Sequence, residues 1–187
     1  MVMATMVPRY TAAEVREFDH PRLRFEVIRG ELFVSPSGPG QRHQEAVGEL
    51  FYLLRGYLER ERLGRVFVAP FEVEFTEDSA TQPDVLVILN GRMDRLGEAL
   101  VQGAPSLAIE VISYSSKRTD RLQKRELYLD EGVEDYWIVD CDQRRVERWR
   151  PGAEAPEVLT ERLLWVPHSH APPLEIDLEA LFAKVWR

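Results

Sequence analysis

The sequence predicts a single domain of the mixed α+β class, with one mixed sheet flanked by helices. Two short apolar runs, PDVLVIL (83–89) and SLAIEVIS (106–113), are typical of central strands that are buried on both faces. An amphipathic helix is expected over 41–62, where apolar residues recur at spacings of three and four. The chain has 187 residues and is 44% hydrophobic, which suits one core formed by residues 1–187.

The N-terminal part predicts a short helix followed by a hairpin. Thr11 and Glu14 have the spacing of a capping box, so we expect a helix over 11–18. The stretch RFEVIRGELFVS (24–35) contains two alternating runs around an Arg-Gly pair, which indicates a β-hairpin.

The next segments predict a helix stop, a strand and a connection. Gly64 follows the long helix and is expected to end it. The stretch RVFVAPFEVEF (65–75) alternates with period two, which predicts one long, half-buried strand. Residues 90–105 are mixed in character and predict a connection with one helical turn.

The second half of the chain predicts a helix, two strands and a terminal helix. The helix is expected over 119–131 and should stop at Gly132. EDYWIVD (134–140) and RRVERWR (144–150) predict two strands joined by a tight polar turn. A Pro-rich, loop-like stretch should then lead to an amphipathic helix in LEALFAKVW (178–186).

Composition excludes several classes of protein. The net charge of −8 argues against a general nucleic-acid-coating protein, but it does not exclude a nuclease with a local basic groove. Cys141 is the one cysteine, so neither an internal disulfide nor a Cys-based zinc site can form within the chain. The sequence lacks a run of eighteen apolar residues and a secretory signal pattern, so we expect no membrane span and a cytoplasmic location.

Each predicted central strand carries one carboxylate in an apolar context. Asp84 begins the first strand and Glu110 interrupts the second. If the strands are neighbours, both carboxylates can project from one face, where they repel each other and raise one pKa. A hard divalent cation between them would offset this repulsion. The two residues therefore predict a metal site, with a raised carboxyl pKa when the metal is absent.

A basic stripe follows the second of these strands. The segment 117–125 holds five basic residues and one acid. On a helix, Arg121, Lys124, Arg125 and Tyr128 share one face, which suits anion binding beside the metal strand. Lys124 lies in the middle of the stripe, where it could approach a phosphoryl oxygen or an attacking water.

Several motifs resemble a known nuclease superfamily. The motifs QPDV, AIEVIS and DRLQKRELYLDEGVEDYWIVD look like those of the PD-(D/E)XK nucleases. More closely, they are similar to the large bacterial group of Uma-type proteins classed as restriction endonucleases. RFEVIRGELFVSPSGPGQRHQ resembles the N-terminal signature of that group, and PPLEIDLEALF resembles its ending. The resemblance covers about residues 11 to 183.

The resemblance implies a restriction-endonuclease-like fold and Mg²⁺-dependent hydrolysis of phosphodiester bonds. By motif match, Asp84 is the Asp of "PD" and Glu110 is the acid of "(D/E)XK". The lysine of that element should follow two residues later, where Ile112 stands. The superfamily permits the lysine to migrate to the following helix, and Lys124 is the candidate. Tyr114 also departs from the group, which usually has a proline there.

A mechanism is implied as well. Asp84, Glu110 and the backbone carbonyl of Val111 would hold Mg²⁺ or Mn²⁺, which polarises the phosphate and activates a water. Lys124 would orient that water or stabilise developing charge. Glu26 matches a glutamate of the family signature and could be a further ligand or a water-orienting group.

Other residues keep two interpretations. Lys124 and Tyr128 match the spacing of a Gln-x-x-x-Tyr helix motif in related nucleases. His43 belongs to the RHQ signature, but it could equally be a hydrogen-bonded core histidine. Glu110 could instead form a purely structural salt bridge with Arg118 or Lys124.

Three functions are therefore compared. The first is a metal-dependent DNA endonuclease. If it dimerises, two chains could together form the groove that binds DNA. The second is an inactive nucleic-acid-binding or structural protein on the same fold. The third, a hydrolase with a serine nucleophile from SYSS, lacks a Gly-x-Ser-x-Gly elbow. The endonuclease requires Asp84, Glu110 and Lys124 to converge, and a Lys124 that points to solvent would argue against it.

Overall fold

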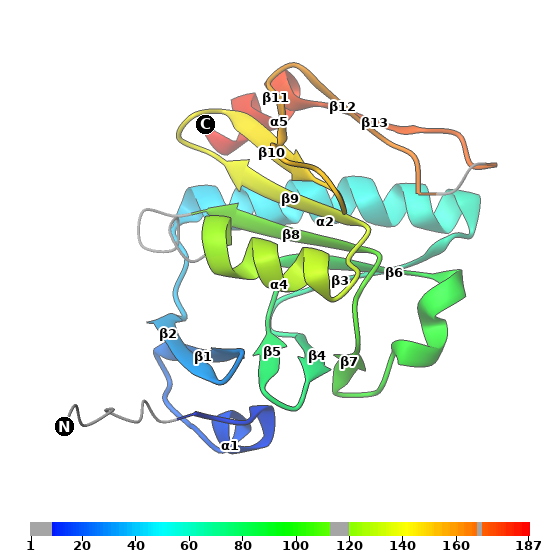
Figure 1. The fold of residues 1–187 in the computed structure, drawn as a ribbon. Helices are drawn as coiled ribbons and strands as arrows, with labels where there is room; N and C mark the ends of the chain where they lie inside the picture. The colour runs from blue at the N-terminus through cyan, green and yellow to red at the C-terminus, as the bar shows by residue number, and fades with distance from the viewer. Residues whose placement is uncertain (1–8, 113–119, 168–169) are drawn as a thin grey trace.

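The computed structural model describes residues 9–112, 120–167 and 170–187, and a six-stranded sheet runs through its centre (Figure 1). The order of this sheet is β11-β10-β9-β8-β6-β3. Its strands, in that order, are Glu157–Leu159, Arg145–Trp149, Asp135–Asp140, Leu107–Ile112, Val85–Leu89 and Gly64–Val68. Strands β8 and β9 run parallel, whereas the other neighbouring strands are antiparallel.

Two further sheets accompany the central one. A five-stranded sheet has the order β2-β1-β5-β4-β7 and a two-stranded sheet pairs β12 with β13. Their strands, in that order, are Glu31–Pro36, Leu23–Ile28, Ser79–Thr81, Glu72–Thr76, Leu100–Gln102, Arg162–Trp165 and Leu174–Asp177. The predicted mixed α+β fold class is confirmed, but the prediction of one sheet is wrong.

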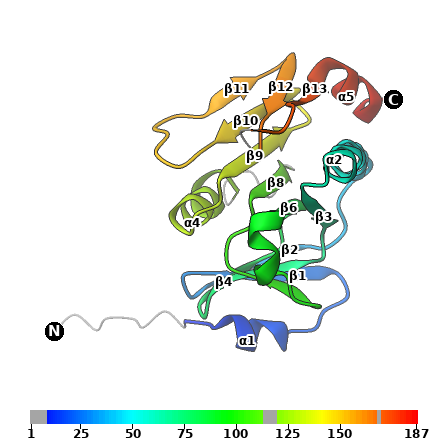
Figure 2. The ribbon, with the colours of Figure 1, turned by 90° about the vertical axis from the view of Figure 1, so that its right-hand side faces the viewer.

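Helices cover both faces of the central sheet. The α-helices are α1 (Ala12–Arg16), α2 (Gln41–Glu61), α4 (Arg125–Asp130) and α5 (Leu178–Val185). A 3₁₀-helix η1 spans Asn90–Arg95, and a π-helical turn η2 spans Asp120–Lys124 directly before α4. Figures 1 and 2 show α2 and α4 on opposite faces of the sheet. No helix in the described ranges is long and apolar enough to cross a membrane.

The predicted helix start and hairpin at the N-terminus are confirmed. Thr11 and Glu14 form both hydrogen bonds of the capping box at the start of α1. The turn between β1 and β2 holds Arg29 and Gly30 in the left-handed region, with φ of 52° and 80°.

The end of α2 differs from the prediction. The helix is capped by Arg62, whose φ is 56°, and not by Gly64. Gly64 instead begins β3, where a Cβ atom would collide with the backbone of Ile88. Its role is thus to allow close strand pairing, which local sequence does not reveal.

The stretch 65–75 is not one strand. It divides into β3 and β4, which belong to different sheets, and Pro70 lies between them. Proline cannot donate a ladder hydrogen bond, so it interrupts the strand although the alternation continues past it. The prediction of a loop-like, Pro-rich stretch near the C-terminus is also wrong, because that stretch contains the short strands β11, β12 and β13.

The two predicted central strands are neighbours, as expected. The antiparallel register pairs Val85 of β6 with Ile109 of β8, and it continues through Leu86 and Ala108. Both strands are almost entirely buried. The parallel connection from β8 to β9 passes through η2 and α4, which places that helix over the sheet beside β8.

Candidate active site

Asp84 directly precedes β6, and its carboxylate accepts a hydrogen bond from the backbone of β8. Its Oδ2 accepts a hydrogen bond of 2.9 Å from the backbone N–H of Val111. Nε2 of His43, in the first turn of α2, lies 3.0 Å from the same oxygen. Nη1 of Arg24, on β1, lies 3.6 Å from Oδ1. The buried carboxylate is therefore held by three different elements.

Glu110 stands opposite Asp84 if the register of β6 and β8 is extended by one pair. Alternation along β8 directs its side chain to the face covered by α4. There Oε1 accepts hydrogen bonds from Nζ of Lys124 at 2.8 Å and from the hydroxyl of Tyr128 at 2.9 Å. The Tyr128 hydroxyl also lies 3.0 Å from Oγ1 of Thr81.

Lys124 points into the protein and not to solvent. Only 3% of its surface is exposed. Its Nζ lies 2.8 Å from Oε1 of Glu110 and 3.0 Å from Oε1 of Glu26. The backbone N–H of Gln82 donates to the same Glu26 oxygen at 2.7 Å. The lysine from the following helix thus reaches back to the acid of β8, although Ile112 occupies the usual lysine position.

The pKa of Asp84 lies below its ordinary value of 3.8, so the expected rise is wrong for this residue. Burial would raise that pKa, but the hydrogen bond and charge of His43 and the charges of Lys124 and Arg24 outweigh it. The pKa of Tyr128 lies well above 10.0 because of burial and the nearby charges of Glu110 and Glu26. Tyr128 therefore stays protonated and can keep donating its hydrogen bond.

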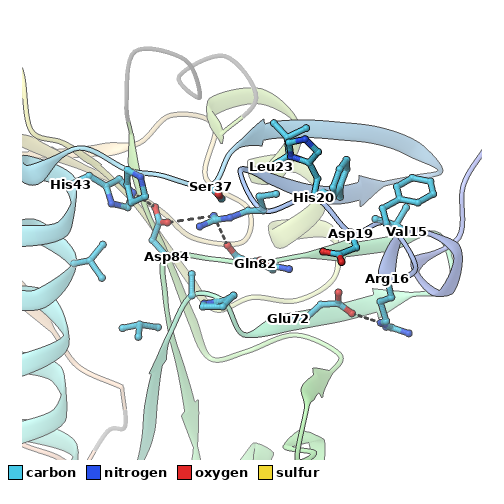
Figure 3. A pocket seen from close by; sticks show the side chains of 18 of the residues that line it. Val15, Arg16, Asp19, His20, Leu23, Ser37, His43, Glu72, Gln82 and Asp84 are labelled. Carbon is cyan, nitrogen blue, oxygen red and sulfur yellow. Dashed lines mark hydrogen bonds and ion pairs between the residues drawn. The ribbon is translucent and has the colours of Figure 1, made fainter.

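An open cleft of about 540 Å³ ends at Asp84. Its walls come from α1, β1, the first turns of α2 and the link between β3 and β4. Figure 3 shows Asp84 and His43 at one end of the cleft, with Arg16 and Glu72 at the other. A candidate metal ligand thus borders a space that a substrate could enter.

Arg24 is a residue of this site that the sequence interpretation missed. Its Nη1 also lies 3.2 Å from the backbone oxygen of Gln82. The guanidinium remains charged, because the neighbouring Glu26, Asp84 and Glu110 more than offset the effect of burial on its pKa. Its spacing of two residues from Glu26 was the available signal, because alternate strand residues share one face.

The donor set suits a hard cation. The N–H and C=O of one strand residue point to the same neighbour, so the Val111 carbonyl lies on the Asp84 side of β8. Carboxylate and carbonyl oxygens with added waters are the ligands that Mg²⁺ prefers. Within the described residues, no three His, Cys, Asp or Glu side chains converge on one point. A metal held by Asp84, Glu110 and the Val111 carbonyl stays a prediction.

Comparison with known proteins assigns the family. The model of Uma2, described as "Putative restriction endonuclease", matches residues 8–181. The chain belongs to the Uma2 family. This confirms the resemblance seen in the motifs, and it makes the protein a member of a nuclease-type family.

A solved structure shows the same fold. It is described as "a putative nuclease belonging to DUF820" from Anabaena variabilis ATCC 29413. The TM-score is 0.79 and the sequence identity is 24%, over 94% of this chain and 99% of that chain. Among curated proteins, no match is found.

Other candidates in this Uma2 protein lie apart from the site or outside the described residues. Arg125 lies over the ring of Trp149, with Cζ 4.8 Å from the ring centroid, whereas Lys124 contacts Glu110, so these two members of the predicted stripe face different neighbours. Burial raises the pKa of Cys141 to about 11, which leaves it a poor nucleophile at neutral pH. Tyr114, Arg118 and the serines of SYSS fall in 113–119, outside the described residues.

Proposed function

We propose that this Uma2-family protein is a metal-dependent endonuclease that hydrolyses phosphodiester bonds of DNA. One observation carries the proposal. Asp84 and Glu110 lie on neighbouring strands, Lys124 from the next helix points inward to Glu110, and Asp84 borders an open cleft. Such an arrangement supports hydrolysis of a phosphodiester, because the reaction needs an oxygen-ligated cation and a fixed positive charge.

In this proposal Asp84, Glu110 and the Val111 carbonyl bind Mg²⁺ or Mn²⁺. When bound, the ion supplies Lewis acidity toward the phosphate and lowers the pKa of a coordinated water. Asp84 is ionised at neutral pH because its pKa is low, so it is ready to act as a ligand. His43 holds that carboxylate in place through Nε2.

Lys124 supplies the fixed positive charge in this proposal. Its ammonium group lies within hydrogen-bond distance of Glu110, so it can stabilise negative charge that develops on a phosphate there. Glu26 contacts the same ammonium and accepts a backbone hydrogen bond. These contacts favour a role for Glu26 in holding Lys124 over a role as metal ligand. Tyr128 holds Glu110 from the other side.

A second candidate is a nucleic-acid-binding or structural protein without activity. It is favoured by the same lysine, because Lys124 already neutralises Glu110 without any metal. The net charge of −8 also restricts DNA contact to a local groove. Whether two chains associate to form that groove stays a prediction.

A plasmid-nicking assay tests the proposal. Wild type is compared in Mg²⁺, in Mn²⁺ and in EDTA with Asp84→Asn, Glu110→Gln and the control Glu59→Gln. Glu59 is an exposed residue of α2 that pairs with Arg55, away from the cleft. We expect metal-dependent nicking by wild type and Glu59→Gln, and none by the two site variants. Equal nicking by all four would overturn the site, and inactive wild type would favour the second candidate.

A further inference from the structure

The cleft that ends at Asp84 is large enough to bind part of a substrate. We propose that it receives one unpaired nucleotide, so that the preferred substrate is single-stranded DNA or DNA with an unpaired base beside the scissile phosphate. This inference rests on the proposed function, because it names the substrate class of the same site.

The size and lining of the cleft suit a nucleobase. Its volume of about 540 Å³ lies in the range of small-molecule sites. Its lining is mixed: apolar side chains, among them Val15, Phe18, Phe25, Val47 and Pro70, alternate with polar and charged ones. A nucleobase has apolar ring faces and a polar edge, so it can use both kinds of side chain.

Phe18 offers a ring on which a base can stack. It is 37% exposed although it borders the cleft. Tyr10 and Phe25 hold it by edge-to-face contacts, with ring centroids 5.9 and 5.5 Å away. A fixed aromatic ring loses little conformational freedom when a base stacks on it.

The two ends of the cleft differ in how closely their arginine is paired with a carboxylate. At the inner end, Arg24 lies beside Asp84, and a guanidinium suits a phosphate oxygen. At the outer end, Arg16 is paired with Glu72, its Nε 2.7 Å from Oε1. Asp19 lines the same outer end, as Figure 3 shows. A strand whose phosphates ran through the outer end would meet carboxylates, whereas a neutral base would not.

Binding measurements test the inference without relying on cleavage. Fluorescence anisotropy compares a labelled single-stranded oligonucleotide with its duplex at one salt concentration, in Ca²⁺, with the DNA shown to be intact on a denaturing gel. We expect wild type to bind the single strand roughly 10-fold more tightly than the duplex. Phe18→Leu keeps apolar volume but removes the ring, so it should lose roughly 10-fold of single-strand affinity. Phe18→Trp should retain that affinity.

Tyr52→Leu is the matched control, because Tyr52 is 72% exposed on α2 and does not line the cleft. It should bind both DNAs as wild type does. Quenching of 2-aminopurine in the single strand by wild type gives a second measurement if Phe18→Leu fails to fold. Equal binding of single strand and duplex, or absence of quenching, would overturn the inference. Binding as expected without any nicking would overturn only the proposed function, and duplex nicking without single-strand preference would overturn only the subsite.

Discussion

Two groups of buried charge lie on the central sheet, and they are built differently. Asp135 and Arg148 form a forked ion pair, in which Nε and Nη2 each lie 2.6 Å from a carboxylate oxygen. Trp137 donates to the same carboxylate at 3.0 Å, and Arg148 donates to the Leu164 carbonyl at 2.8 Å. The candidate site lies three residues further along β8, because Asp135 pairs with Leu107 and Glu110 with Ile138.

The difference lies in how the charges balance. The Asp135–Arg148 pair belongs to a balanced set of two acids and two bases, because Arg150 lies 3.8 Å from Asp135 and Glu157 lies 3.9 Å from Arg148. The candidate site places three carboxylates (Glu26, Asp84 and Glu110) against Lys124 and Arg24, and Arg24 keeps a longer contact of 3.6 Å. Both groups border a hollow, of about 360 and 540 Å³, so a hollow alone does not mark function. An excess of acid beside a hollow is what suits a cation.

Removing one partner of the forked pair should have the largest effect. Arg148→Met leaves the buried Asp135 carboxylate with only the more distant Arg150, 3.8 Å away, which should lower the free energy of unfolding by about 3–5 kcal/mol. Urea denaturation measures this change. The double variant Asp135→Asn/Arg148→Met should recover much of the loss, because it leaves no unpaired charge. A loss below about 1 kcal/mol in Arg148→Met would contradict a structural role for the pair.

Replacing the lysine of the site should strongly affect activity. Lys124→Gln should slow nicking by about 10²–10³-fold, because a fixed positive charge is lost from the site. It also frees Glu110 from its ammonium partner, so Mg²⁺ should raise the melting temperature of this variant more than that of wild type. Lys184→Gln, at an exposed lysine paired with Glu49, is the control and should change neither result. Equal stabilisation of Lys124→Gln and wild type by Mg²⁺ would argue against competition between lysine and metal.

Glu110 and Glu26 both contact Lys124, but their replacement should have different effects on metal affinity. Glu110→Gln should weaken Mg²⁺ or Mn²⁺ binding by more than about 10-fold, because a ligand is lost. Glu26→Gln should slow nicking but leave metal affinity unchanged, because Glu26 contacts the ammonium of Lys124. Calorimetric titration of each variant with metal measures the affinities. If Glu26→Gln loses as much affinity as Glu110→Gln, Glu26 is a ligand.

The smallest expected effect is on stability in acid. The low pKa of Asp84 in the fold means that its ionised form stabilises the protein above pH 3.8, its ordinary pKa. This contribution is lost as the pH falls through the lower pKa of the folded state. In EDTA, the unfolding free energy of wild type should therefore fall relative to Asp84→Asn below pH 3.8. His43→Leu should reduce this difference, because His43 lowers that pKa. If the unfolding free energies of wild type and Asp84→Asn fall equally with pH, the lowered pKa of Asp84 is contradicted.

Local sequence predicted the parts of the fold that local chemistry determines. The continuous apolar runs identified β6 and β8, and the single acid in the second run marked Glu110 as unusual. The capping box and the Arg-Gly turn were also legible from neighbouring residues. The motif resemblance indicated Lys124, and the structure places it next to Glu110.

Contacts between distant segments could not be predicted in this way. Arg24 reaches Gln82 and Asp84 only because the five-stranded sheet carries β1 to the start of β6. His43 meets Asp84 across 41 positions of sequence. Such pairings depend on how sheets and helices pack. The alternation of apolar residues along one strand does not determine that packing. The alternation in 65–75 likewise predicts one strand, because it does not show that β3 and β4 belong to different sheets.

The placement of Lys124 on a helix has a consequence for how the protein matures. A lysine two residues after Glu110 would be present as soon as β8 formed. Lys124 reaches Glu110 only after η2 and α4 have docked on the sheet, and Glu26 reaches it only after the N-terminal hairpin has joined. A partly folded chain therefore carries the acids without their lysine. If the proposed function holds, competence to cut would be acquired only together with the complete tertiary structure, and an immature molecule would leave nearby DNA intact.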